Sequence, residues 1–196
     1  MILIFGRTAS GKTTISHELE RKGLKALESY TTRPARYAGE RGHTFVTREE
    51  SDELHRTQEV VAEVEINGHS YFATAEQVRE SDIYVLDPVA GERLMDAMPD
   101  ERFICISVFV WTTERKRRFL ARDASATKED FDRRCESEED LFAIWEEEVI
   151  LPDEDMSINK HENVIAHHVL CEPTMDDIHA LIDKVLEEVE EMGVCH

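Results

Sequence analysis

Eight residues near the start of the chain combine glycines, hydroxyl groups and a lysine in a pattern suited to phosphate binding. They run Gly6-Arg7-Thr8-Ala9-Ser10-Gly11-Lys12-Thr13 and fit G-x-x-x-x-G-K-[ST] at every fixed position. The glycines permit a tight turn whose successive backbone N–H groups point toward an anion. We expect Lys12 to reach the β- and γ-phosphates of a nucleotide and the Thr13 hydroxyl to ligate Mg²⁺. These residues, with Thr14, predict a site for ATP and Mg²⁺.

The elements on either side of this stretch decide whether the pattern is meaningful. The apolar run Met1–Phe5 is rich in strand-forming residues, and residues 14–22 read as a helix that stops at Gly23. A helix N-terminus behind the glycine loop adds partial positive charge. A chance glycine-rich turn is the alternative, and the strand–loop–helix order disfavours it.

A second stretch, residues 29–46, is unusually rich in arginine, hydroxyl residues and glycine. Arginines stand at positions 33, 36 and 41. The planar guanidinium suits bidentate contacts with phosphate, and glycines allow close approach. The composition fits a second anion site or a solvated basic surface loop, and by itself it leaves both open.

Two further segments carry groups that could act on a bound phosphate. The apolar run Ile83–Leu86 ends in Asp87, an arrangement typical of the strand beside a phosphate loop, where a carboxylate can hold Mg²⁺ through water or position an acceptor. Residues 113–122 and a helix through 131–134 carry arginines on both sides of the polar loop 123–127. These arginines either close over phosphates or pair with the acidic C-terminal part.

The remaining pattern alternates strands and helices and predicts an α/β fold with a parallel sheet covered on both faces. We expect a strand at 24–27, a helix at 49–56, a short helix after Thr74, a helix at 89–98 and strands at 102–111 and 163–170. An acidic helix at 138–149 and a final amphipathic helix capped by Thr174 complete the order. Residues 59–66 and 69–74 read as a β-hairpin joined by Asn67-Gly68.

Composition narrows the classes of partner and compartment. The chain has 196 residues, 41% hydrophobic and 34% charged, and a net charge of −20. Residues 1–48 carry nine Lys/Arg against four Asp/Glu, whereas residues 136–196 carry two against nineteen. This balance argues against nucleic acid as a partner. No apolar run reaches membrane-span length, and the unpaired spacing of the four cysteines favours reduced thiols, so we expect a cytoplasmic protein without a histidine-built metal site.

The glycine loop together with Ser29-x-Thr31-Thr32-Arg33-x-x-Arg36-x-x-Gly39-Glu40 resembles guanylate kinase and related nucleoside monophosphate kinases. The resemblance covers residues 1 to about 134. It implies a P-loop NTPase fold with a parallel central sheet, a small acceptor-binding β-hairpin subdomain and a helical lid. The implied single kinase domain has a core at 1–28, 83–111 and 135–196, an acceptor-binding subdomain at about 29–82 and a lid at about 112–134.

The same resemblance implies roles for individual residues. Arg33 and Arg36 match the pair that clamps the acceptor phosphate, Tyr71 matches a phosphate-contacting tyrosine, and His43 stands near where the family has another tyrosine. Three further residues match family positions that contact the guanine base: Ser29, Thr74 and, as the candidate carboxylate, Glu63. Asp87 matches the acid after the strand, but the second acid of that family motif is missing. Arg122, with either Arg133 or Arg134, matches the lid arginines.

The implied activity is ATP-dependent phosphoryl transfer to a nucleoside monophosphate, and the resemblance favours GMP or dGMP as the acceptor. The altered hairpin and the missing acid keep a second acceptor class open, such as another nucleotide or ribose 1,5-bisphosphate. A catalytically silent binding module is a third reading, which the intact Lys12 and Thr13 disfavour. The expected partners are small nucleotides, without nucleic acid or membrane, in a monomer or homodimer.

Overall fold

A parallel sheet forms the centre of the protein. The computed structural model describes residues 1–122, 125–150 and 161–192, without the side chains of residues 144 and 146–150. Four strands within these ranges, β1 (Ile2–Phe5), β6 (Ile83–Val85), β7 (Phe103–Phe109) and β8 (Val164–Cys171), lie in the order β6-β1-β7-β8. Each neighbouring pair is parallel. Every residue of β1 and β7 is buried, as expected of strands covered on both faces.

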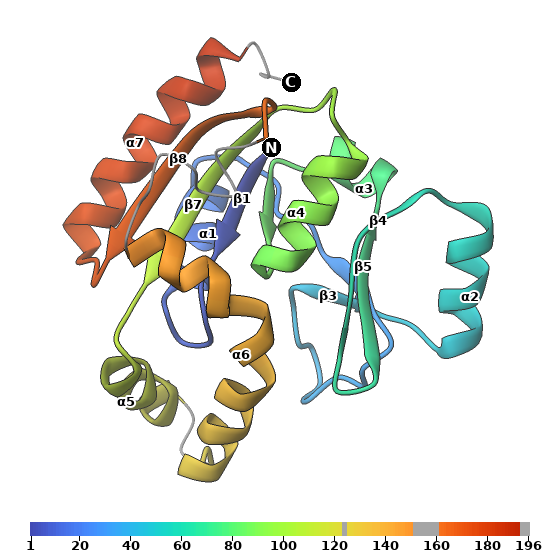
Figure 1. The fold of residues 1–196 in the computed structure, drawn as a ribbon, viewed down its shortest axis with the longest axis horizontal. Coiled ribbons are helices and arrows are strands. Elements are labelled where there is room, and N and C mark those ends of the chain that lie inside the picture. Colours follow the sequence, from blue (N-terminus) through green and yellow to red (C-terminus); the bar gives the residue numbers. More distant parts are fainter. Residues whose placement is uncertain (123–124, 151–160, 193–196) are drawn as a thin grey trace.

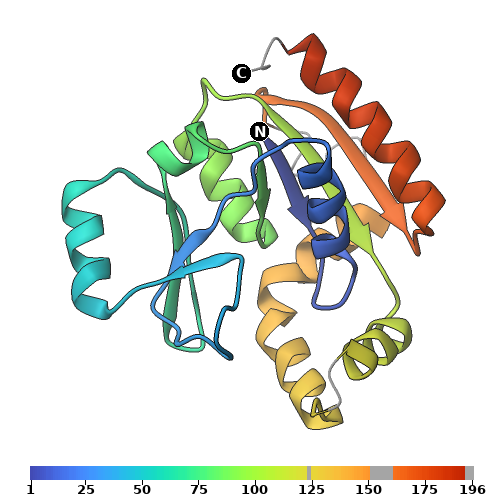
Figure 2. The same ribbon diagram turned by 180° about the vertical axis from the view of Figure 1, so that it is seen from behind.

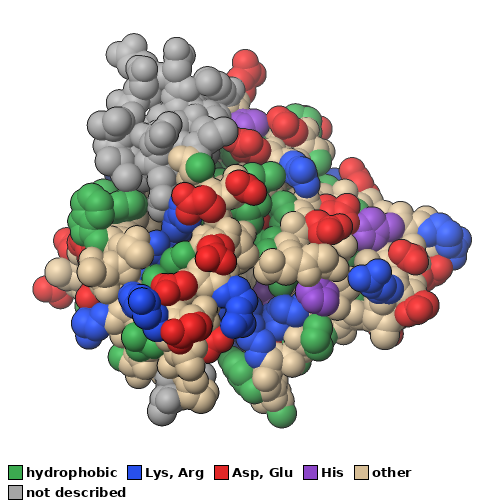
Figure 3. Space-filling view, turned by 60° about the horizontal axis from the view of Figure 1, so that its bottom comes forward, with side chains coloured by type: hydrophobic (Ala, Val, Ile, Leu, Met, Phe, Trp, Pro, Cys, Tyr) green, Lys and Arg blue, Asp and Glu red, His purple; other side chains and the backbone are tan. Residues whose placement is uncertain are grey.

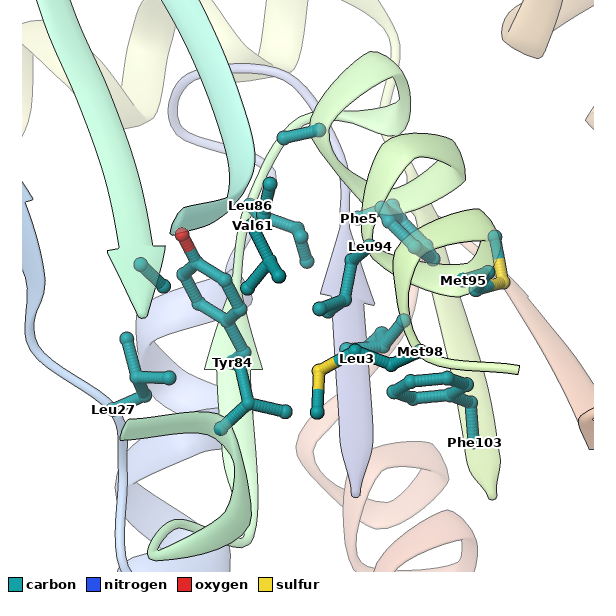
Figure 4. Close-up of a cluster of buried hydrophobic side chains, with 14 of the residues drawn as sticks. Leu3, Phe5, Leu27, Val61, Tyr84, Leu86, Leu94, Met95, Met98 and Phe103 are labelled. Carbon is teal, nitrogen blue, oxygen red and sulfur yellow. The ribbon is translucent and has the colours of Figure 1, made fainter. Parts of the chain in front are cut away.

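Helices cover the two faces of this sheet, as predicted (Figures 1 and 2). On one face, α1 (Lys12–Arg21) and α7 (Met175–Glu191) pack against alternate residues of the strands. On the other, α4 (Pro88–Ala97) and α6 (Lys128–Ile150) bury a second set that includes Phe5 and Phe103. Figure 4 shows this second set, in which α4 lies directly over β1.

A second, smaller sheet lies beside the first. Its described strands are β2 (Ser29–Thr31), β3 (His43–Phe45), β4 (Val60–Ile66) and β5 (His69–Thr74), in the order β3-β2-β5-β4. The predicted hairpin is confirmed: Asn67 and Gly68 have φ of 53° and 74°, the left-handed pair that a two-residue turn requires. Helix α2 (Arg48–Thr57) lies on the side of the second sheet that faces away from the first sheet, and α3 (Ala75–Arg79) follows β5 in the chain (Figure 1).

Capping explains where several helices begin. Thr47 and Glu50 form a complete capping box at α2, and Thr74 and Gln77 form one at α3, the two helices predicted to start there. The predicted cap Thr174 also forms a capping box, at the start of α7. Its buried residues recur at three- and four-residue spacing: Ile178, Leu181, Ile182, Val185 and Val189. None of the described helices combines the length and the apolar character that crossing a bilayer requires.

Three local predictions were wrong. Residues 24–27 make only one bridge, Ala26 to Ile83, because the chain leaves the central sheet at once and starts β2 at Ser29. The arginine-rich stretch is not all loop, since β2 and β3 pair in parallel within it. The two helices expected near 131–134 and 138–149 are one continuous helix, α6, because neither glycine nor proline interrupts it.

Between β7 and α6 the chain forms the predicted helix α5 (Thr112–Arg122), followed by a short connection. Residues 123 and 124 of the expected polar loop lie outside the described residues. Thr127 then accepts the backbone N–H of Asp130 at 3.1 Å and begins α6. Cys105, Cys135 and Cys171 are free thiols, and Cys195 lies outside the described residues.

Candidate active site

The glycine loop connects β1 to α1 in the conformation that the sequence pattern predicts. Gly6 has φ of 150° and Gly11 of 112°, which side chains other than hydrogen rarely permit. A Cβ on Gly6 would lie 2.6 Å from both the Ser10 hydroxyl and the Val108 carbonyl oxygen. Helix α1 begins directly at Lys12, so its N-terminus faces the loop. The loop therefore has the glycine turns and the adjacent helix N-terminus on which the predicted anion site depends.

The Lys12 ammonium is folded back onto this loop. It donates to the carbonyl oxygens of Gly6 and Arg7, the latter at 3.1 Å. Burial lowers the pKa of Lys12 to about 8, and the nearby charge of Glu138 opposes part of that shift. A phosphate anion would add a second negative charge, besides that of Glu138, near this buried ammonium.

Asp87 lies beside the loop because β1 and β6 are neighbouring parallel strands, with Ile4 opposite Val85. One Asp87 carboxylate oxygen accepts the backbone N–H of Ala90 at 2.9 Å and caps α4. Burial raises the pKa of Asp87, and that hydrogen bond opposes the rise. Asp87 and Thr13 line the same cavity and offer carboxylate and hydroxyl oxygens, the ligand type that Mg²⁺ prefers. Among the described side chains, no cluster of three His, Cys, Asp or Glu forms a separate metal site.

Glu40 holds the two arginines of the second sheet. Its carboxylate accepts two hydrogen bonds from Arg33, at 3.0 and 3.1 Å, and one from the Arg36 guanidinium at 3.3 Å. The Arg36 backbone N–H adds a fourth at 2.7 Å. Burial raises the pKa of Glu40, but these hydrogen bonds outweigh it and lower the value overall. The Arg33 Nε is buried without a hydrogen-bond partner among the described residues.

Ser29, His43 and Tyr71 come together across three strands of the second sheet. His43 Nδ1 is 3.0 Å from the Ser29 hydroxyl, and its ring meets that of Tyr71 edge-on with centroids 5.6 Å apart. Burial lowers the pKa of His43 and the charge of Arg33 adds to the effect, so His43 is neutral at pH 7. Tyr84 at β6 completes the group, and burial raises its pKa.

Two of the arginines that the resemblance matched to a lid, Arg122 and Arg134, lie over one aromatic ring. Arg122 lies over the Phe119 ring at 4.8 Å and Arg134 at 5.2 Å, measured from guanidinium carbon to ring centroid. Burial lowers the pKa of Arg134 and the charge of Arg122 adds to this, whereas the Arg133 side chain is 74% exposed and pairs with Asp130. Arg133 and Arg134 were the two candidates for the second lid arginine, and Arg134 is the more buried of them.

These groups surround one cavity of about 650 Å³ between the glycine loop, the second sheet and α6. On the face that Figure 3 presents, basic side chains gather near the middle, next to a histidine. The candidate residues that line the cavity are Gly6, Thr8, Lys12, Thr13, Ser29, Arg33, Arg36, His43, Tyr71, Asp87, Arg133 and Arg134.

Other candidate residues do not line it. Glu63 turns away and pairs with His55 at 3.0 Å, because a bulge in β4 places Ala62, with φ of 56°, on the cavity side instead. The Thr74 hydroxyl accepts the Gln77 N–H and caps α3. Arg7 points to α6, where it pairs with Glu139 at 3.1 Å. The cavity lining also excludes Ala9, Ser10, Gly11, Thr14 and Arg122.

Four residues near the site were missed in the sequence analysis. Glu40 was part of the quoted motif, and a glutamate among arginines was a usable signal. The sequence around Tyr84 and Glu138 gave no such signal, because the residues that surround them in the cavity come from distant parts of the chain. Arg115 is 4% exposed and donates to the Val110 and Thr8 carbonyl oxygens at 3.1 and 3.3 Å, which ties α5 to the glycine loop.

Comparisons with known proteins agree with this geometry. No curated protein sequence matches the chain. A guanylate kinase from Anaplasma phagocytophilum has a similar structure, with 17% identity and a TM-score of 0.56 over all of this chain and 86% of that one. An uncharacterized protein from Eubacterium ventriosum aligns with 10% identity and a TM-score of 0.45, over 97% and 98% of the two chains.

The sheet order, the glycine loop and the structural similarity confirm the predicted P-loop NTPase fold. A family model described as AAA domain (AAA_18) matches residues 2–141, which is most of the sequence. The chain therefore belongs to this AAA domain family of P-loop proteins.

Proposed function

We propose that this protein is a kinase that transfers the γ-phosphoryl group of ATP to a small phosphorylated acceptor, a nucleoside monophosphate in the first instance. The observation that carries the proposal is the shared cavity. Lys12 and Thr13 of the glycine loop line it from one side, and the Arg33 and Arg36 pair lines it from the other. Two anion sites facing each other across one cavity are what in-line transfer between two phosphates needs.

On the donor side, the loop N–H groups and Lys12 bind the phosphates of ATP. Lys12 leaves the carbonyl oxygens of Gly6 and Arg7 and turns to the β- and γ-phosphates. Thr13 and Asp87 would hold Mg²⁺, which would neutralise charge on the phosphoryl oxygens when bound.

On the acceptor side, Arg33 and Arg36 clamp the acceptor phosphate while Glu40 fixes their positions. The position of both arginines in the lining of the cavity supports this role. Tyr71 and neutral His43 donate further hydrogen bonds. A phosphate acceptor needs no general base, so catalysis rests on positioning and positive charge.

Arg134 and Arg122 act from the lid, residues 112–134, when it closes over the phosphates. Arg134 is preferred to Arg133 because it is the more buried and lies among the other arginines of the site. In this division the acceptor-binding subdomain covers residues 29–82, which contain every described strand of the second sheet. Residues 1–28, 83–111 and 135–196 form the kinase core.

GMP and dGMP are the first acceptors to test, on the resemblance of the arginine-rich motif. One observation favours a second acceptor class, another nucleotide or a ribose bisphosphate. Glu63, the candidate for reading guanine, pairs with His55 outside the cavity. The cavity beside Ser29 and Tyr84 is lined by Ala62, Val64, Ile66, Asn67 and His69, none of which is acidic.

Coupled ADP release with ATP and Mg²⁺ tests the proposal against GMP, dGMP, AMP, CMP, UMP, dTMP and ribose 1,5-bisphosphate. Turnover with GMP or dGMP alone supports the nucleotide kinase. Turnover with another acceptor keeps the mechanism and changes the substrate. No turnover by wild-type protein that still binds ATP would instead support a binding module, and Lys12→Ala protein is the control for background hydrolysis.

A further inference from the structure

Glu138, on α6, is bonded to the glycine loop. The Thr8 backbone N–H donates to both oxygens of its carboxylate, at 2.9 and 3.1 Å, and the Thr8 hydroxyl donates to one of them. Glu138 and Thr8 both line the cavity that contains Lys12. A loop shaped to receive anionic oxygens thus already contacts one from the protein itself.

The position of this carboxylate conflicts with a bound triphosphate. Its charge lies close enough to Lys12 to act on the pKa of that ammonium. A γ-phosphate brought to Lys12 would therefore face a negative charge within the same half-buried cavity. The two anions also compete for a limited set of donors, since the Thr8 N–H already has two carboxylate contacts.

A place for the displaced carboxylate exists on the same helix. Arg134 lies one turn before Glu138, and the two charges already interact. A small movement of α6 away from the loop would exchange the Thr8 donors for this guanidinium. Because α6 also carries the proposed lid arginine, the same movement would change the position of that arginine.

We propose that Glu138 is an internal competitor for the phosphate loop. It holds Thr8 while the donor site is empty, and a triphosphate binds in full only after α6 has withdrawn the carboxylate. Glu138 thus sets the nucleotide affinity and couples occupation of the donor site to α6. The inference rests on the proposed function, because it requires ATP to bind at the glycine loop.

The test is the dissociation constant of fluorescent ATP for wild type and for Glu138→Gln, with Mg²⁺ present. Glutamine keeps the size and an acceptor oxygen for the Thr8 N–H but removes the charge, so we expect affinity to rise about tenfold or more. Glu136→Gln makes the same change at an exposed position of the same helix and should leave the affinity within about twofold of wild type.

Glu138→Ala provides a readout that a purely structural role would not give. Without nucleotide its melting temperature should fall, because the contacts to Thr8 are lost, while its affinity for ATP should rise. A fall in both would overturn the competitor role. Equal or weaker binding by Glu138→Gln, with wild type binding ATP, overturns it as well. Absence of ATP binding in all four proteins, wild type and the three variants, would overturn the proposed function itself, and the inference with it.

Discussion

The two proposed anion sites of this protein are built in opposite ways. The donor site is one uninterrupted stretch, residues 6–13, fixed between the fully buried strand β1 and helix α1. The acceptor site is assembled from β2, β3 and β5 and from a loop that Glu40 holds in place. Its sheet is partly exposed and includes the left-handed residue Ala62. The contrast suggests that donor binding depends on local backbone shape and acceptor binding on side chains that distant segments bring together.

The largest expected effect separates the two sites most directly. Lys12→Ala should reduce kcat about 10³-fold, because it removes the one ammonium of the loop that reaches the phosphates in transit. Steady-state ADP release measures this loss. The variant should melt no lower than wild type, since the lysine is buried at a cost. Activity above about a tenth of wild type would disprove the donor assignment.

Glu40→Ala should act on the acceptor site alone. We expect the KM for the acceptor to rise about 10²-fold, because Arg33 and Arg36 lose the carboxylate that orients them. The dissociation constant of ATP should stay unchanged, and Arg36→Ala should show the same selectivity. Equal losses for ATP and acceptor would mean that the two sites are not independent.

Gly91→Ala tests the packing beneath the donor site. A Cβ at this position would lie 2.5 Å from the Phe5 ring, which is fully buried in β1. Overpacking costs about 1–3 kcal/mol and exceeds the gain of about 1 kcal/mol in helix propensity. Urea unfolding should show a net loss of stability. A more stable variant would mean that the core around β1 is looser than its burial indicates.

The pH dependence of ATP binding reports on Lys12. Its pKa is about 8 in the free protein, so below pH 8 the ammonium is charged with or without ATP. Bound phosphate raises this pKa, so above pH 8 binding must take up a proton and the affinity should fall up to about tenfold per pH unit. Titrations with fluorescent ATP at pH 7, 8 and 9 measure the slope. Lys12→Arg, which stays charged, should remove it.

The smallest expected effect lies in the second sheet. Ala62 has φ of 56°, a left-handed conformation that costs a residue with a side chain about 1–2 kcal/mol. Ala62→Gly should relieve that cost, but it also removes a buried methyl group and adds unfolded-state entropy, so the stability should change by less than about 0.5 kcal/mol. Urea unfolding provides the measurement. A clear stabilisation would mean that backbone strain outweighs the packing of the Ala62 methyl group, and a clear destabilisation would mean the reverse.

The same contrast explains what the sequence could predict. The glycine loop, the strand before it and the helix after it follow from adjacent residues, and the capping boxes at Thr47 and Thr74 likewise need only four residues each. Asp87 was placed beside the loop because parallel neighbouring strands end at one edge. Glu63 was not predictable in this way, since the bulge at Ala62 reverses which side chain faces the cavity and leaves no pattern in the sequence.

The connections between the two sheets determine how they can move. The chain crosses near Leu27 on the way out and near Ile83 on the way back, and the Leu27 N–H donates to the Ile83 carbonyl oxygen at 2.8 Å. Asp82 and Lys25 exchange two further hydrogen bonds, each of 2.8 Å. Two crossings fastened side by side resist sliding of one sheet past the other. Val61 and Val64 of β4 also share one buried cluster with Leu94 of α4, so a rotation about the crossings would have to separate these side chains. The distance between the proposed donor and acceptor phosphates is therefore set by this shared core as well as by the two connections.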